Sequence, residues 1–249
     1  MGKLKDKVAV ITGGSTGIGL ASAKLFALEG AKVFITGRRQ AELDAAVKSI
    51  GSLATGIRGD ISDPTDIDAL YEVVGAQNQK IDVLFANAGG GSFRPLQAID
   101  EAHYTATFDT NVKGTLFTVQ KALPLLQDGA SIILTGSTAG STGIPSFSVY
   151  SASKAAIRSF ARSWILELAP RGIRVNVLAP GSTSTPGWHE LTPTSEANEQ
   201  MQEMVRSTTP LGRLAEPKEI AQVALFLASI DSSYVNGIEL FADGGSAQV

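Results

Sequence analysis

A short apolar run near the N-terminus leads directly into a glycine-rich loop and then into a helical pattern. The run is Val8–Ile11, and its β-branched residues predict a buried parallel strand. The loop Thr12–Gly19 has the spacing G-x-x-x-G-x-G, and apolar residues follow at helical spacing from 20 to 28. A strand, a glycine turn and a helix in this order are typical of a dinucleotide site. A glycine-rich strand exit without a ligand is the alternative.

The loop suits a pyrophosphate for two physical reasons. Glycines let the backbone come close to the phosphates, and the start of the following helix offers free N–H groups and the positive end of its dipole. We therefore expect the loop to contact a dinucleotide through Gly13, Ser15, Thr16, Gly17, Ile18 and Gly19.

Strands and helices alternate along the rest of the chain. This alternation predicts an α/β fold in one domain, residues 1–249, with a doubly wound, mostly parallel, seven-stranded sheet and helices on both faces. The polar segment 186–209 has two helical pieces and is the candidate substrate lid. The further strands are expected at 32–36, 54–58, 81–85, 130–135, 174–178 and 238–241, with helices at 40–50, from 64, at 102–123, from about 150 and at 217–228.

Composition excludes several classes of function. The 249 residues carry a net charge of -3 with no basic block, so nucleic acid is not an expected partner. There are no cysteines and only two histidines, His103 and His189, which argues against a metal centre. No apolar run approaches the ~20 residues of a membrane span, and the N-terminus does not resemble a signal peptide, so a cytoplasmic protein is expected.

The end of the second predicted strand bears on the choice of cofactor. An NAD site usually has a carboxylate there, about 20 residues beyond the glycine loop, to hold the ribose 2′-OH. This chain has Gly37, followed by Arg38 and Arg39, and guanidinium groups suit a 2′-phosphate. We therefore expect NADP rather than NAD; two arginines on a solvated turn are the alternative. After the third strand, Asp60 is expected to accept a bond from the adenine amine, next to Ile61, unless it is only a solvated loop carboxylate.

Tyr150 and Lys154 are four residues apart, which places both side chains on one face of a helix. A phenol has a pKa near 10. A neighbouring ammonium favours the phenolate and lowers that pKa, so the pair can serve as an acid/base unit at a carbonyl carbon. The spacing alone is common by chance. Ser137 ends the fifth strand thirteen residues earlier, and it meets Tyr150 only if the intervening loop folds back over the sheet edge.

Two further polar positions stand out. Asn87-Ala88-Gly89 follows the fourth strand, where small residues would let a flat ring lie against the backbone, although a flexible turn explains them equally well. Asn111 lies within an otherwise apolar helical stretch, where it is costly unless paired; an exposed asparagine is the alternative.

Together these motifs resemble the short-chain dehydrogenase/reductase family over nearly the whole chain. The motifs are T-G-x-x-x-G-I-G at 12–19, N-A-G at 87–89, Asn111, Ser137, the Y-x-x-x-K pair, and P-G-x-x-x-T at 180–185. The resemblance implies a Rossmann fold and a homo-oligomer, commonly a tetramer. Stretches 118–126 and 239–249 are similar to bacterial NADP-dependent members that act on secondary alcohols and ketones.

The resemblance also implies a role for each site residue. Tyr150 would exchange a proton with the substrate oxygen, Lys154 would lower the tyrosine pKa and bind the nicotinamide ribose, and Ser137 would position the carbonyl. Asn111 would hold a water of the proton relay. Further cofactor contacts are implied at Asn87, Ala88, Gly89, Pro180, Gly181, Thr183 and Thr185. Two departures from the family pattern are Ala86, where a second asparagine is frequent, and Thr183, where an aliphatic residue is commoner.

These residues predict an NADP-dependent alcohol dehydrogenase or ketone reductase with a small alcohol or ketone as substrate. The alternatives within the family are a 3-oxoacyl thioester reductase and a sugar dehydrogenase. An acyl-carrier partner would require a basic patch at the mouth of the site, where Arg94 is the only support. A sensor that binds NADP without turnover is disfavoured, because both Tyr150 and Lys154 are present.

Overall fold

The computed structural model describes residues 2–77, 79–192 and 194–249. Its centre is one seven-stranded sheet with the strand order β3-β2-β1-β4-β5-β6-β7, in which every paired strand is parallel. The predicted fold is therefore confirmed, and the sheet is wholly rather than mostly parallel. The strands are β1 (Val8–Ile11), β2 (Lys32–Gly37), β3 (Ala54–Arg58), β4 (Ile81–Ala86), β5 (Leu126–Thr135), β6 (Arg174–Pro180) and β7 (Glu239–Ala242).

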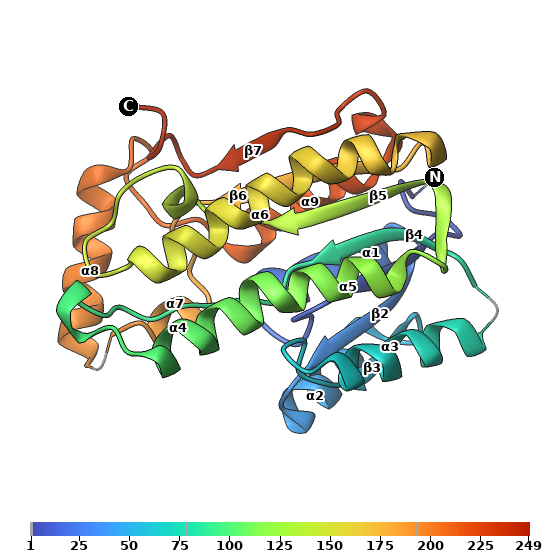
Figure 1. Ribbon diagram of the computed structural model, residues 1–249, viewed down its shortest axis with the longest axis horizontal. Helices are drawn as coiled ribbons and strands as arrows, with labels where there is room; N and C mark the ends of the chain where they lie inside the picture. The colour runs from blue at the N-terminus through green and yellow to red at the C-terminus, as the bar shows by residue number, and fades with distance from the viewer. Residues whose placement is uncertain (1, 78, 193) are drawn as a thin grey trace.

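Helices cover both faces of the sheet (Figure 1). Those on one face are α1, α2 and α9, and those on the other are α3, α5 and α6. The α-helices are α1 (Gly17–Leu28), α2 (Gln40–Ile50), α3 (Pro64–Ala76), α4 (Glu101–Phe108), α5 (Gly114–Ala122), α6 (Ser148–Glu167), α7 (Pro186–His189), α8 (Ser195–Thr208) and α9 (Pro217–Ala228). A π-helical turn, η2 (Asp109–Lys113), joins α4 to α5, and short 3-10 turns lie at η1 (Leu96–Ala98), η3 (Thr138–Gly140), η4 (Ala169–Arg171) and η5 (Ile230–Ser232).

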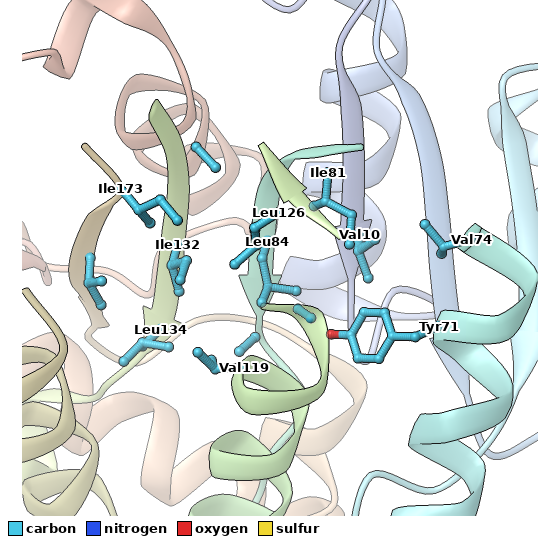
Figure 2. Packing of buried hydrophobic residues seen from close by; sticks show 14 of the residues in the cluster. Val10, Tyr71, Val74, Ile81, Leu84, Val119, Leu126, Ile132, Leu134 and Ile173 are labelled. Atoms are coloured by element: carbon cyan, nitrogen blue, oxygen red, sulfur yellow. The ribbon is translucent and has the colours of Figure 1, made fainter. Parts of the chain in front are cut away.

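Alternate residues of each central strand enter two separate cores. Val10 and Leu84 point to the face covered by α3, α5 and α6, whereas Ile11 and Phe85 point to the face covered by α1, α2 and α9. Figure 2 shows the first core, in which Tyr71 directs its hydroxyl to the backbone of α5. A strand buried on both faces must be apolar, which is why β1 is apolar throughout and β4 is apolar from Val83 to Ala86, after the half-buried Asp82.

The chain order reverses between β1 and β4, which are neighbours in the sheet. In open parallel sheets, ligands bind beyond the carboxyl ends of the strands at such a reversal. The carboxyl ends point toward α4, α7 and α8 on the left of Figure 1. The glycine loop, the segment after β4 and the segment after β5 all leave the sheet at this edge.

Two segments add detail to the predictions. The expected helix 102–123 is interrupted by the π-helical turn η2, which contains Asn111. The candidate lid contains two helices, α7 and α8, where two helical pieces were predicted. Residue 193, which belongs to this segment, lies outside the described residues. Across the described ranges, the model has no helix that is both long and apolar enough to cross a membrane.

Candidate active site

The glycine loop is packed against the segment that follows β4. The hydroxyl oxygen of Thr12 accepts hydrogen bonds from the backbone N–H groups of Asn87 and Ala88, both at 3.1 Å. The Asn87 amide donates to the carbonyl of Thr12 at 3.0 Å and to that of Gly13 at 3.3 Å. A Cβ at Gly19 would lie 2.1 Å from the Gly13 carbonyl oxygen, so only glycine allows this close approach. The loop is therefore held in one shape by the chain itself.

The start of α1 fits a bound phosphate. Its N-cap residue, Thr16, makes no side-chain capping bond within the described chain, so the first N–H groups of the helix face the loop without that partner. Gly17 has φ of 53°, and a Cβ there would lie 3.2 Å from the Thr185 side chain. The glycine loop and the segment after β6 thus approach each other across the sheet edge. Ile18, by contrast, packs its side chain on the core beside α1.

The predicted 2′-phosphate region is open and charged. Gly37 is buried at the end of β2, and a Cβ there would lie 2.5 Å from the Ser15 hydroxyl oxygen. Arg38 lies next to it with its side chain 73% exposed and 3.7 Å from the Asp60 carboxylate. Arg39 is also exposed but is paired with Glu42 at 2.9 Å. Of the two arginines, Arg38 has the freer guanidinium.

Asp60 already forms hydrogen bonds within its own loop. Its carboxylate accepts bonds from the Ser62 backbone N–H at 2.9 Å and from the Ser62 hydroxyl at 2.8 Å. Burial acts to raise the pKa of this carboxyl, but the Ser62 bonds and Arg38 outweigh it and lower the pKa. Ile61 is buried against Gly114, where its side chain fixes the loop on α5.

The segment after β6 is ordered by backbone contacts. Gly181 lies so close to Asp243 that a Cβ would be 2.8 Å from its Cα. Pro180 ends β6, and the buried Thr183 donates its hydroxyl to the Gly181 carbonyl at 3.0 Å. Thr185 caps α7 by accepting the Trp188 N–H at 3.1 Å. This part of the predicted cofactor site therefore leads directly into the candidate lid.

Tyr150 and Ser137 meet, as the resemblance implies. Tyr150 lies in the first turn of α6, and the loop between β5 and α6 returns over the sheet edge. The Ser137 side chain lies near the Tyr150 phenol and acts to lower the pKa of Tyr150. Burial of the ring is the larger effect and raises that pKa above its usual value. The lowering of the tyrosine pKa by the neighbouring ammonium stays a prediction.

Lys154 lies one helical turn further along α6 and is 4% exposed. Its ammonium group donates to the backbone carbonyl of Thr135 at 2.9 Å and lies 5.5 Å from the centre of the Tyr150 ring. Burial lowers the pKa of Lys154 to about 8. The lysine is thus fixed between β5 and the tyrosine, and close to the backbone of Gly89.

Asn111 is 1% exposed, so the exposed alternative is wrong. Its Oδ1 accepts the Gly90 N–H at 3.0 Å, and its Nδ2 donates to the Gly90 carbonyl at 2.9 Å and to the Ser153 hydroxyl at 2.9 Å. The π-helical turn lets the side chain reach both partners, and such turns are frequent at functional sites. Through these bonds Asn111 joins the segment after β4 to α6. The bound water that the resemblance implies for Asn111 stays a prediction.

Four contributors to the site were not among the predicted site residues. They are the Thr12 hydroxyl, the Thr135 carbonyl, the Ser153 hydroxyl and the stacking of Phe147 on Tyr150, with 4.4 Å between ring centres; Phe147 itself was expected only as one side of an apolar pocket or as core. Thr12 and Ser153 belong to the T-G and Y-S-A-S-K stretches, so their place beside motif residues was an available signal. The Thr135 carbonyl has no sequence signal, because every residue has one.

Comparisons with known proteins agree with this geometry. The family model described as enoyl-(acyl carrier protein) reductase matches residues 13–247. The oxidoreductase asL5 of Sarocladium schorii is 49% identical over 249 residues, which cover 99% of this chain and 98% of that protein.

Two solved structures are similar over almost their whole length. One, titled as a short chain dehydrogenase/reductase family protein, has a TM-score of 0.88 at 38% identity, covering 99% of this chain and 100% of its own. The other, levodione reductase, has a TM-score of 0.93 at 30% identity, covering 99% of each chain. The chain therefore belongs to the short-chain dehydrogenase/reductase family and is an oxidoreductase.

Proposed function

We propose that this protein is an NADP-dependent ketone reductase that also oxidises the corresponding secondary alcohol. The observation that carries the proposal is the cluster of Ser137, Tyr150 and Lys154 at the carboxyl edge of the sheet, beside a glycine loop that fits a pyrophosphate. An acid/base group next to a dinucleotide site is what the reduction of a carbonyl requires.

Each side chain has a separate task in this proposal. NADPH, when bound, supplies the hydride to the carbonyl carbon. Ser137 donates a hydrogen bond to the substrate oxygen, and the Tyr150 hydroxyl gives that oxygen its proton. Lys154, held by the Thr135 carbonyl, stabilises the negative charge that develops on the phenol oxygen. In the direction of oxidation, the Tyr150 phenolate takes the proton from the alcohol.

The choice of NADP is supported at the end of β2. A carboxylate side chain cannot replace Gly37 without displacing Ser15, because even a Cβ would lie 2.5 Å from the serine hydroxyl oxygen. Position 37 therefore offers no carboxylate for a ribose 2′-OH, which supports NADP over NAD. Arg38 is the adjacent cation, exposed and only loosely paired with Asp60 at 3.7 Å. A guanidinium in this position suits a 2′-phosphate.

An apolar substrate is supported by the surface beside Tyr150. Phe147 stacks on Tyr150, and Phe93 stacks on Phe147 with 4.5 Å between the ring centres. Phe93 is 39% exposed and Ile144 is 37% exposed, although both are large apolar side chains. Exposed apolar groups next to a polar catalytic cluster favour a ketone with an aromatic or aliphatic substituent over a sugar.

A 3-oxoacyl thioester reductase is the second candidate, because the description of the matching family model, enoyl-(acyl carrier protein) reductase, also names an acyl-carrier substrate. An acidic carrier protein would require free cations near the site. Arg94, the cation expected there, is paired with Asp100 at 3.6 Å. The pairing reduces its attraction for a second acidic group, so the ketone is favoured.

A panel of substrates tests the proposal. Initial rates of NADPH oxidation would be measured with a bulky aryl ketone, a 3-oxoacyl thioester and a keto sugar. We expect the aryl ketone to have the highest kcat/KM. Turnover with the thioester alone would move the activity to acyl chemistry, and tight NADPH binding without turnover would favour a sensor. The homotetramer and the cytoplasmic location stay predictions, which size-exclusion chromatography and cell fractionation would test.

A further inference from the structure

Gly91 makes the closest approach to Tyr150 of any glycine near the site. A Cβ built on Gly91 would lie 2.5 Å from Cδ2, 2.8 Å from Cγ and 2.9 Å from Cβ of Tyr150. These atoms belong to the base of the ring rather than to its tip. Because the base of a side chain is tied to its helix, it cannot move aside as a flexible chain end can.

The requirement for glycine at position 91 comes from this contact and not from an unusual backbone dihedral angle. Gly91 is not among the glycines with a positive φ, so alanine can adopt its backbone conformation without strain. Gly90, one residue earlier, has no atom within 4 Å of its built Cβ. The steric limit is therefore specific to the residue that contacts the tyrosine.

The Tyr150 ring has little freedom to yield. Phe147 stacks on it with 4.4 Å between the ring centres, and the Ser137 side chain lies near its phenol. The segment that carries Gly91 is itself fixed, because Asn111 binds both backbone groups of Gly90. A methyl group at position 91 would have to displace the ring from Ser137, or displace the segment from Asn111.

We propose that Gly91 is a positioning residue for Tyr150: the bare backbone at this position lets the ring lie where its phenol meets Ser137 and approaches Lys154. The inference deepens the proposed function and depends on it for its kinetic test. It assigns a role to a residue outside the N-A-G turn, through a contact with the tyrosine ring.

Gly91→Ala is the direct test. A displacement of about 1 Å at a reacting group can cost about a hundredfold, so we expect kcat for ketone reduction to fall by about 10- to 100-fold. The Kd of NADPH should change much less than kcat, because the nearest atoms to the added methyl group belong to Tyr150 and not to the glycine loop. The matched control is Gly143→Ala in the loop before α6, whose built Cβ has no atom within 4 Å and which should keep the wild-type kcat.

The pH profile separates positioning from a general loss of structure. Burial raises the pKa of Tyr150 and the nearby Ser137 side chain lowers it, so a ring that stays buried but moves away from Ser137 should have a higher pKa. The rise of alcohol oxidation with pH should therefore move to higher pH in Gly91→Ala, whereas it should not move in Gly143→Ala. A wild-type kcat and an unmoved profile in Gly91→Ala would overturn the inference.

A double-mutant cycle of thermal stability tests the positioning role of Gly91 without an activity measurement. Gly91→Ala should lower Tm in the wild-type background and lower it less in a Tyr150→Ala background, where the contacts at 2.5 and 2.8 Å are gone and only the Cβ contact at 2.9 Å remains. Equal losses in both backgrounds would show that the ring does not set the requirement. An inactive wild type would refute the proposed function alone, since the cycle and a crystal structure of Gly91→Ala would still show whether the ring is displaced.

Discussion

The two halves of the sheet edge are built in opposite ways. On the side of β4, β5 and α6, the functional groups are buried and already paired: Lys154 is 4% exposed and Asn111 is 1% exposed. On the side of β2 and β3, Arg38 has a side chain that is 73% exposed, and its ion-pair partner Asp60 lies at 3.7 Å. The first half is organised by the chain itself, whereas the second leaves its charge available to a ligand.

This difference indicates which properties of the protein a substitution in each half of the site should change. A buried group that bonds the backbone cannot be altered without loss of the geometry around it. An exposed arginine on a turn can be altered at little cost to the fold. Substitutions on the first side should therefore affect turnover and stability, and those on the second side should affect mainly the choice of cofactor.

The largest expected effect is that of Tyr150→Phe. Removal of the proton donor should lower kcat by about 10²- to 10⁴-fold, because general acid/base groups contribute that much. NADPH binding, followed by fluorescence titration, should be retained. Tyr234→Phe, on the fully exposed tyrosine, is the matched control and should keep full activity. Equal activity of both variants would show that Tyr150 is not the proton donor.

Asn111→Ala should cause the next largest change. It would leave the Gly90 N–H and C=O groups and the Ser153 hydroxyl without their partner. We expect the free energy of unfolding in urea to fall by about 2–4 kcal/mol, together with a loss of activity. Gln200→Ala, at an exposed position of α8, should change the stability little. An unchanged midpoint for Asn111→Ala would mean that the π-helical turn does not depend on these bonds.

Lys154 should make the stability depend on pH. Its pKa falls from 10.5 to about 8 on folding, because burial disfavours the charged form. Between these values the unfolded chain binds more protons than the folded chain, so stability should rise with pH. The gain should reach up to about 3 kcal/mol between pH 8 and pH 10.5.

Lys154→Met isolates this contribution, because both proteins contain the same buried tyrosines. Urea unfolding at intervals from pH 7.5 to 9.5 should show a rising stability for the wild type relative to the variant. A constant difference across this range would contradict the lowered lysine pKa.

The smallest expected effect on stability, and the sharpest on cofactor choice, is that of Arg38→Asp. Loss of a charge-assisted bond to the 2′-phosphate should raise the KM for NADPH by about tenfold to a hundredfold. NADH use should fall far less, and kcat should change little. Arg39→Asp should have the weaker effect, because Arg39 is already paired with Glu42. An unchanged preference in Arg38→Asp would remove Arg38 from the cofactor site.

Much of the fold could be predicted from hydrophobic patterns alone. The helices α2 and α9 and the strand β3 begin and end at the predicted residues, because turn residues and apolar periodicity mark both limits. The π-helical turn at Asp109–Lys113 could not be predicted, since it depends on bonds between Asn111 and distant residues. Local sequence does not encode those tertiary contacts.

In the site, too, local sequence predicted some features, and tertiary contacts determined the others. Ser137 could be placed at the carboxyl edge of the sheet, because it follows a parallel strand, but its approach to Tyr150 depended on the return of the loop between β5 and α6 over that edge. The pKa of Tyr150 could not be predicted from the spacing to Lys154, because burial of the ring has the larger effect. The contact between Gly91 and Tyr150 was also beyond the sequence, in which three consecutive glycines look alike.

A single-turnover experiment with the wild-type protein tests the central claim most directly. Stoichiometric NADPH would be bound, an aryl ketone added, and both NADPH absorbance and the alcohol product followed. The account predicts one alcohol formed for each NADPH oxidised, with a much slower reaction when NADH replaces NADPH. Bound NADPH that persists in the presence of the ketone, with no alcohol formed, would contradict the assignment of this cluster to carbonyl reduction.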